Sequence, residues 1–124
     1  MIHGKRANAD IRGYDHRWRR ASTEFLRRYP WCWGCQAIGV RRKADLVDHV
    51  VPHRGDMIRF WNSNNWQAAC KWHHDSVKAE LERRFEARKI PASELHLQSA
   101  TAVKLTRERH RPAVGVDGFP IPGT

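Results

Sequence analysis

Three cysteines and two histidines limit how a chain of this size can be stabilised. Cys32 and Cys35 form a Cys-x2-Cys pair, and Cys70 is followed three and four residues later by His73 and His74. Disulfide pairing of three cysteines would leave one thiol over, whereas three thiolates and one imidazole complete a tetrahedral zinc site. Taken alone, Cys70 is also explained as a small buried apolar residue. The two half-sites together favour structural zinc and a reducing compartment.

The hydrophobic composition also indicates that such a metal is needed. Hydrophobic residues make up 40% of the 124 positions, but six of them are tryptophan and many are alanine. Aliphatic packing is therefore thin, and small domains of this kind usually depend on disulfides or a metal. His73 and His74 diverge by about 100° on a helix, so only one of them should face the zinc. Spacing alone leaves open which one does.

A basic helix is expected near the N-terminus. Asp15 is a plausible N-cap, and the helix should run to Tyr29 and stop before Pro30. One face of it is mostly apolar: Trp18, Ser22, Phe25, Leu26 and Tyr29. The other positions are rich in arginine and could meet a phosphate backbone or simply face solvent.

Two strands and a second helix are expected downstream. Ala44–Val51 has the β-branched composition of a strand that ends at Pro52, and Gln67–Ala69 could form a short second strand. Residues 71–88 have helical composition, with an apolar stripe at Val77, Leu81 and Phe85. The sequence thus predicts an α+β domain over residues 14–90. We expect a flexible basic arm over residues 1–13 and a partly irregular extension over 91–124, with a short helix within 92–109.

The formal net charge is +10, and basic residues concentrate near the N-terminus. Residues 5–28 contain eight lysines and arginines but only three acidic residues. Such a surface favours nucleic acid, because each phosphate that a cation neutralises releases condensed counterions. Arg17, Arg19 and Arg20 are the main candidates for DNA contacts, although a high pI without a polyanionic partner is an open alternative. No apolar run approaches a membrane span, and residues 1–10 lack a signal-peptide core, so we expect a cytoplasmic protein.

Asp48 and His49 form a candidate catalytic pair at the end of the expected strand. Neighbouring strand residues point to opposite faces, so one can bind a metal while the other addresses a nearby water. If the second helix packs across the strand, His74 can join Asp48 in a carboxylate-imidazole cation site. A neutral His49, with an ordinary pKa of about 6.5, is suited to remove a proton from that water.

The order Asp48-His49, Asn65 and His74, with the wording VDHVVPHRGD and NWQ, resembles the HNH endonucleases. The resemblance covers residues 14–78 and implies a ββα-metal core with an N-terminal basic helix and a structural zinc knuckle. It implies that His49 is the general base and that Asp48 and His74 bind a divalent cation such as Mg²⁺, Mn²⁺ or Ni²⁺. It further implies that Asn65 constrains the loop that orients His49.

By the same resemblance, the zinc ligands are Cys32, Cys35, Cys70 and His73. His73 stands where the family usually has cysteine, and zinc accepts three thiolates and one histidine. The wording is similar to a phage-encoded branch found beside DNA-packaging genes. It implies cleavage of double-stranded DNA with low sequence specificity and a possible terminase partner.

Three further residues are candidates for DNA contacts: His53, Arg54 and Lys78. His53 could contact phosphate or cap its loop. Lys78, four residues after His74, could reach the DNA backbone or be a solvated helix residue. The alternative function is a zinc-stabilised DNA-binding or accessory module with a vestigial nuclease site. The set of Asp48, His49, Asn65 and His74 argues for the enzyme, because binding alone requires none of them.

Overall fold

A two-stranded antiparallel sheet lies at the centre of the fold. The computed structural model describes the backbone of residues 2–117 and the side chains of residues 15–109. Strand β1 (Leu46–His49) pairs with β2 (Trp66–Ala69), so that His49 lies opposite Trp66. Both predicted strands are confirmed, but β1 is shorter than predicted. Beyond His49 the backbone N–H of Val50 donates to the Asn65 carbonyl, and the chain turns away into the following loop.

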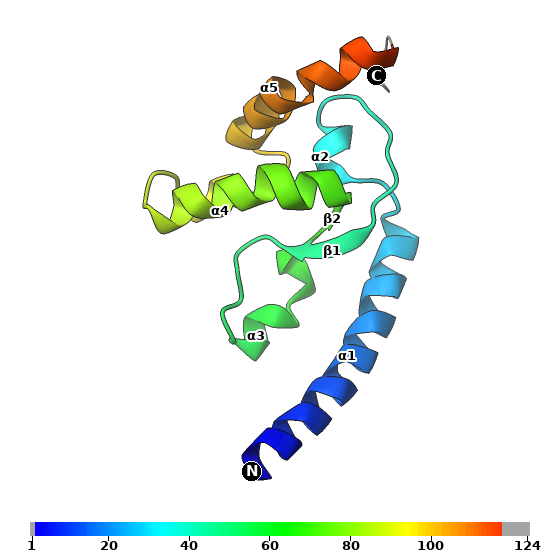
Figure 1. Ribbon diagram of the computed structural model, residues 1–124, viewed down its shortest axis with the longest axis vertical. Coiled ribbons are helices and arrows are strands. Elements are labelled where there is room, and N and C mark those ends of the chain that lie inside the picture. Colours follow the sequence, from blue (N-terminus) through cyan, green and yellow to red (C-terminus); the bar gives the residue numbers. More distant parts are fainter. Residues whose placement is uncertain (1, 118–124) are drawn as a thin grey trace.

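Helix α1 (Ile2–Arg28) runs beside β1 and extends past the sheet (Figure 1). It ends before Pro30, as predicted, but it begins at Ile2. The predicted N-cap at Asp15 is therefore wrong, and residues 2–13, expected to form an arm, are helical. Those residues contain no proline, and their two glycines, Gly4 and Gly13, weaken a helix without ending it.

The apolar face of α1 packs on the sheet through aromatic rings. The Trp18 and Phe25 rings lie 5.1 and 5.6 Å from the Trp66 ring, both edge-on. Phe25 also contacts Tyr29, which is 42% exposed at the rim of this cluster. The predicted face is thus confirmed, and α1 is fixed to the end of the sheet where β1 finishes.

The helical region after β2 carries the predicted apolar stripe. Its first backbone N–H, at Lys71, donates to the Asp45 carboxylate at 2.7 Å. A π-helical segment (His73–Lys78) then leads into α4 (Ala79–Glu86), with Val77 and Leu81 fully buried. The π-helical geometry was not predicted; such segments are frequent at functional sites.

The C-terminal part closes the core. After a short 3₁₀ turn (Ala92–Leu95), α5 (Ala100–Asp117) begins with its Ala102 N–H bonded to the Ser99 hydroxyl. Apolar side chains from this part are buried together with Val77 and Leu81: Leu95, Leu97, Ala102 and Leu105. The predicted helix within 92–109 is confirmed. The expectation of irregular structure from Pro112 is wrong for residues 112–117, which are helical, and residues 118–124 lie outside the described part.

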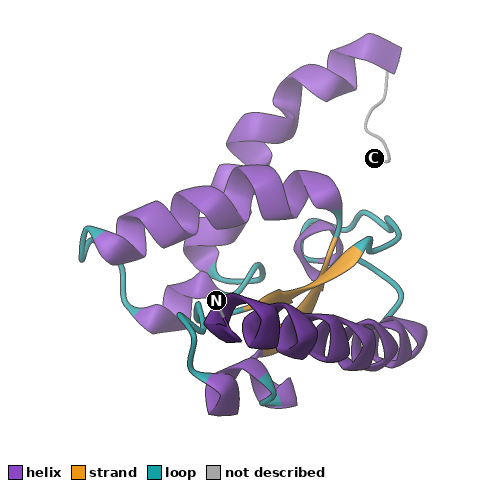
Figure 2. Ribbon diagram, turned by 60° about the horizontal axis from the view of Figure 1, so that its bottom comes forward, coloured by secondary structure: helices purple, strands orange, loops and turns teal. Residues whose placement is uncertain are grey.

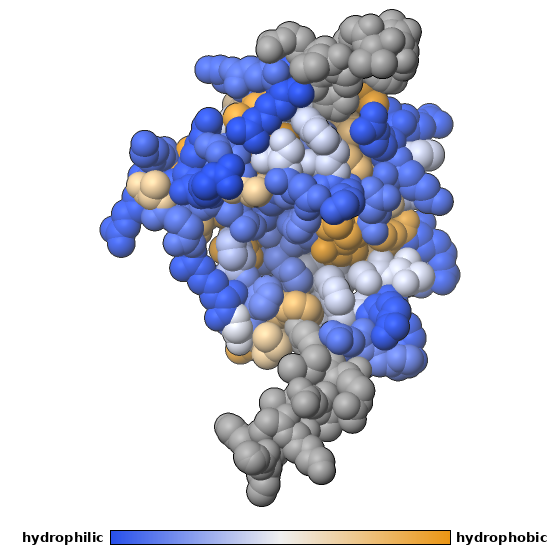
Figure 3. Space-filling model, in the orientation of Figure 1, coloured by the Kyte–Doolittle hydropathy of each residue, from blue (hydrophilic) through white to orange (hydrophobic). Residues whose placement is uncertain are grey.

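Short helices complete the loops: α2 (Trp33–Gln36), α3 (Met57–Phe60) and a 3₁₀ turn (Ser63–Asn65). Figure 2 shows the strand pair enclosed by helices, with α1 along one side and α4 on the other. The face seen in Figure 3 is mostly hydrophilic, with small apolar patches. Among the described residues, no helix has the length and apolar content needed to cross a membrane.

Candidate functional site

Three cysteines and one histidine meet in a buried cluster between α2, β2 and the π-helical segment. The ligand atoms of Cys32, Cys35, Cys70 and His73 all lie within 4.8 Å of one another, and all four residues are buried. His73 Nδ1 lies 3.5, 3.5 and 3.6 Å from the sulfurs of Cys32, Cys35 and Cys70, and the Cys35 and Cys70 sulfurs are 4.0 Å apart.

These separations fit a tetrahedral zinc ion. With bonds of about 2.3 Å to sulfur and about 2.1 Å to nitrogen, the edges would be about 3.6 Å (N to S) and about 3.8 Å (S to S). Hydrogen bonds with Cys32 and Cys70, together with burial, raise the pKa of the Cys35 thiol well above its ordinary value. Ionised thiols this close together repel one another, and a cation at the centre of the cluster would compensate their negative charge. The cluster can therefore hold a metal, and the four residues are those that the sequence analysis grouped.

His74 points away from this cluster, toward Asp48. Its Nδ1 lies 3.1 Å from Asp48 Oδ1, close to the distance of about 3.0 Å between adjacent ligands of an octahedral ion with bonds of about 2.1 Å. Burial acts to raise the pKa of Asp48, but the hydrogen bond with His74 and the charge of Lys78 outweigh it, so that pKa is lowered. The Asp48 side chain is 4% exposed and that of His74 is 44% exposed. The pair thus presents an ionised oxygen and a nitrogen at an accessible position.

His49 is held in one orientation by a backbone carbonyl and a ring stack. Its Nε2 lies 3.0 Å from the Phe60 carbonyl oxygen, which also accepts the Trp66 indole N–H at 2.8 Å. A carbonyl oxygen only accepts, so Nε2 carries the hydrogen and Nδ1 keeps its lone pair. The Trp18 ring stacks on His49 at 5.2 Å and 22°. Burial lowers the pKa of His49, which keeps the imidazole neutral at pH 7.

Asn65 clamps the turn that follows His49. Its side-chain oxygen accepts the Val51 N–H and its side-chain nitrogen donates to the Val51 carbonyl, both at 2.9 Å. Its own backbone carbonyl accepts the Val50 N–H at 2.8 Å. The two residues after His49 are therefore tied to Asn65 by three hydrogen bonds.

A cleft of about 340 Å³ brings most of these side chains together. Its lining comprises Val47, Asp48, His49, Pro52, His53, Arg54, His74 and Glu82. His53 Nδ1 accepts the Gly55 N–H at 3.1 Å, so the hydrogen of the neutral ring is on Nε2. Arg54, at φ 48°, pairs with Glu86 and keeps about half of its side chain exposed.

Lys78 lies beneath this cleft and does not face solvent. Its side chain is 1% exposed, and Nζ lies 2.6 Å from the His49 carbonyl oxygen, 2.8 Å from Asp48 Oδ2 and 2.7 Å from Glu82 Oε2. Both sequence interpretations of Lys78, as a DNA contact and as a solvated residue, are wrong. Lys78 lies on the helix face that packs against the end of β1. The carboxylates of Asp48 and Glu82 compensate its charge there, so the side chain can be buried.

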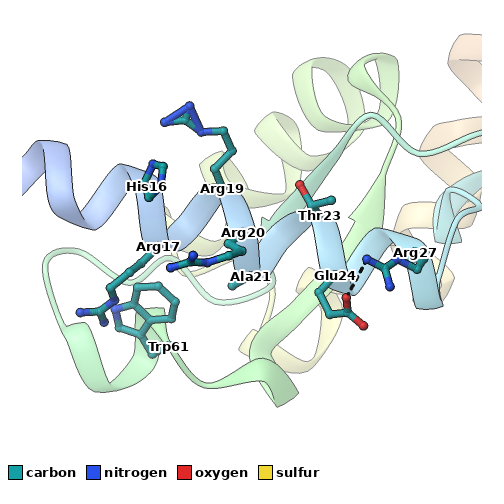
Figure 4. Close-up of a pocket in the computed structure, with 9 residues that line it drawn as sticks. All are labelled: His16, Arg17, Arg19, Arg20, Ala21, Thr23, Glu24, Arg27 and Trp61. Atoms are coloured by element: carbon teal, nitrogen blue, oxygen red, sulfur yellow. Dashed lines mark ion pairs between the residues drawn. The ribbon is translucent and has the colours of Figure 1, made fainter.

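Four arginines of α1 line a second hollow, of about 700 Å³, together with Trp61: Arg17, Arg19, Arg20 and Arg27. Arg17 and Arg20 project toward the side of Trp61, whereas Arg19 points away from it (Figure 4). The Arg17 guanidinium lies 4.9 Å from the centre of the Trp61 ring. Arg19 and Arg20 are exposed. The hollow is separate from the Asp48 cleft, but Trp18 of the same helix stacks on His49, so α1 links the two regions.

Two residues that support the cleft, Gln67 and Trp18, were not predicted from the sequence to do so. Gln67 is fully buried; it donates to Asp48 at 2.9 Å and accepts the Leu97 N–H at 3.0 Å. It lies opposite Asp48 in the strand pairing, and the sequence alone did not supply that register. Trp18 was placed on the apolar face of its helix, but nothing in its spacing indicated the stack on His49.

Comparison with known proteins relates the fold of this chain to a solved structure. No protein-family model and no curated protein sequence matches the chain. Among solved structures, the HNH endonuclease of the deep-sea thermophilic bacteriophage GVE2, crystallised with manganese ion, matches with a TM-score of 0.52 and 25% identity. The match covers 68% of this chain and 95% of that one. The chain therefore has the fold of the HNH endonucleases and resembles a phage nuclease of that family.

Proposed function

We propose that this chain is a divalent-metal-dependent endonuclease that hydrolyses phosphodiester bonds of double-stranded DNA. One observation carries the proposal: the same cleft contains a neutral His49, whose Nδ1 lone pair is left available, and the Asp48–His74 pair. Similarity to the phage HNH endonuclease supports the same reaction class. A binding module would have no use for this combination of groups.

The reaction follows from the roles that the geometry allows. Asp48 and His74 would hold the cation, which supplies stabilisation of the negative charge on the phosphate and leaving oxygens. His49 removes a proton from the attacking water at Nδ1, and its Nε2–H bond to Phe60 keeps the ring in place during the transfer. Asn65 holds the turn after His49, and His53 offers its Nε2–H to a phosphate oxygen.

The DNA would lie across the cleft and along α1. Arg17, Arg19 and Arg20 supply cations on this helix, and Arg54 supplies another at the cleft. These contacts are to phosphates and carry no sequence information, so we expect low sequence specificity. Mg²⁺, Mn²⁺ and Ni²⁺ are the candidate catalytic cations; the phage neighbour was crystallised with manganese.

Structural zinc is the second metal of the proposal. Cys32, Cys35, Cys70 and His73 have the donor types and separations of a zinc site with no open position. The phage origin of the neighbour supports a phage-encoded protein acting in the bacterial cytoplasm. We propose that it works with the DNA-packaging terminase, on the resemblance of its VDHVVPHRGD wording to the packaging-associated branch.

Cleavage of supercoiled plasmid tests the nuclease. Purified protein should convert it to nicked or linear forms with Mg²⁺, Mn²⁺ or Ni²⁺ and lose this activity in EDTA. His49→Ala should lower the rate by about 10²–10⁴-fold while DNA binding in a gel shift is retained. His96→Ala, which alters an exposed histidine outside the cleft, is the matched control. Nicking by His49→Ala at the rate of the control would refute the role of His49.

A further inference from the structure

A histidine that binds a metal through one ring nitrogen usually donates a hydrogen bond from the other ring nitrogen, and His73 makes such a bond. Its Nδ1 faces the three sulfurs, and its Nε2 lies 3.0 Å from the Thr106 hydroxyl oxygen in α5. That hydroxyl donates its own hydrogen to the Ala102 carbonyl at 2.8 Å, so toward His73 it is the acceptor. Nε2 therefore carries the ring hydrogen, and the lone pair is left on Nδ1, toward the sulfurs.

Gly34 leaves the space that the imidazole ring occupies. A Cβ atom at this position would lie 2.3 Å from Cδ2 and 2.4 Å from Nε2 of His73. The two described glycines with positive φ are Gly39 and Gly55, so Gly34 is not needed for its backbone conformation. The absence of a side chain matters because the ring is packed directly against the Cys32–Cys35 turn.

We propose that Thr106 and Gly34 are positioning residues that allow a histidine to close the zinc site, and that zinc binding thereby holds α5 in place. The inference rests on the proposed zinc site. Thr106 selects the tautomer and the ring orientation, and Gly34 admits the ring. A cysteine at position 73 would need neither residue, because a thiolate has no second nitrogen and no ring.

The contact between Thr106 and His73 adds a polar link between the zinc cluster and the C-terminal part, which also packs on the core through apolar side chains. Thr106 is fully buried in α5, and its hydroxyl contacts His73, a candidate zinc ligand. Without that acceptor, the Nε2–H would be buried and unpaired, and the ring would lose the contact that directs Nδ1 toward the metal. Loss of a partner of this kind typically weakens metal binding about 10–100-fold.

The experiment measures zinc affinity by chelator competition and the visible spectrum of the Co²⁺-substituted protein. Thr106→Val should weaken zinc binding about 10–100-fold and shift the cobalt bands, whereas Thr106→Ser, which keeps the hydroxyl, should restore both. Thr23→Val, at an exposed position in α1, is the control for the same exchange in a helix. Equal affinities for the Val and Ser variants at position 106 would overturn the role of Thr106.

A second arm repeats the changes with His73→Cys. Gly34→Ala should abolish zinc binding in the native chain but leave it nearly unchanged in the His73→Cys chain, and Thr106→Val should become neutral there. Losses of the same size in both backgrounds would mean that these residues act through packing alone and would overturn the proposal. A native chain that binds no zinc would instead refute the zinc site itself, so the two failures are distinguishable.

Discussion

Replacing Lys78 with methionine removes the buried charge beneath the cleft that Asp48 and His49 line, and keeps most of the side-chain volume. Lys78 is 1% exposed, and its ammonium lies within 2.6–2.8 Å of three acceptors. Two of these are carboxylates with different surroundings: Asp48 is 4% exposed, and Glu82 is 39% exposed. The third is the carbonyl of His49, so the change affects both a proposed cation ligand and the proposed base.

The expected cost is set by Asp48. Removing one partner of a buried ion pair typically destabilises a protein by about 3–5 kcal/mol, because the other charge remains buried without compensation. Asp48 retains Gln67 and His74 as partners, which places the cost toward the lower end, near about 3 kcal/mol. Glu82 is 39% exposed, so water can solvate its carboxylate once Lys78 is replaced, and the loss of this ion pair adds little to the free-energy cost.

Urea unfolding of the zinc-saturated protein measures this cost. With a slope of about 1–3 kcal/mol per molar urea, the midpoint for Lys78→Met should fall by at least about 1 M. Glu82→Gln removes the more exposed partner and should change stability by no more than about 1 kcal/mol. If Lys78→Met unfolds at the same urea concentration as Glu82→Gln, the buried ammonium does not stabilise the cleft and the reasoning is wrong.

Two further predictions concern the proposed metal sites. Protein purified without added metal should contain about one zinc per chain by elemental analysis, and chelation should unfold it cooperatively, because the core is small; a folded, zinc-free sample would contradict this. His73→Ala should lower zinc content and thermal stability, whereas His74→Ala should stay folded and zinc-loaded yet lose plasmid cleavage. The reverse pattern in melts, zinc content and nicking rates would exchange the two assignments.

Short-range spacing was sufficient for several parts of the site. Cys32 and Cys35 lie on one turn, and three thiols with one imidazole complete the four-coordinate set that zinc prefers, so the three cysteines could be grouped from the sequence, whereas spacing left the choice between His73 and His74 open. The stripe of Val77, Leu81 and Phe85 was also predictable, since periodicity shows which helix face is buried. The start of α1 was not predictable, because an aspartate such as Asp15, which suits an N-cap, is also tolerated within a helix.

The sequence by itself determined which chemical groups this protein has for its two proposed metal sites and in what order they occur. Only the tertiary structure decided that His73 faces the sulfurs and His74 faces Asp48. It also decided that Lys78 is buried rather than exposed and that Thr106 meets His73. The physical reason is that ligand types and helical periods depend on neighbours within one or two turns. Burial and hydrogen-bond partners depend on how segments distant in sequence pack, and no local pattern encodes that arrangement.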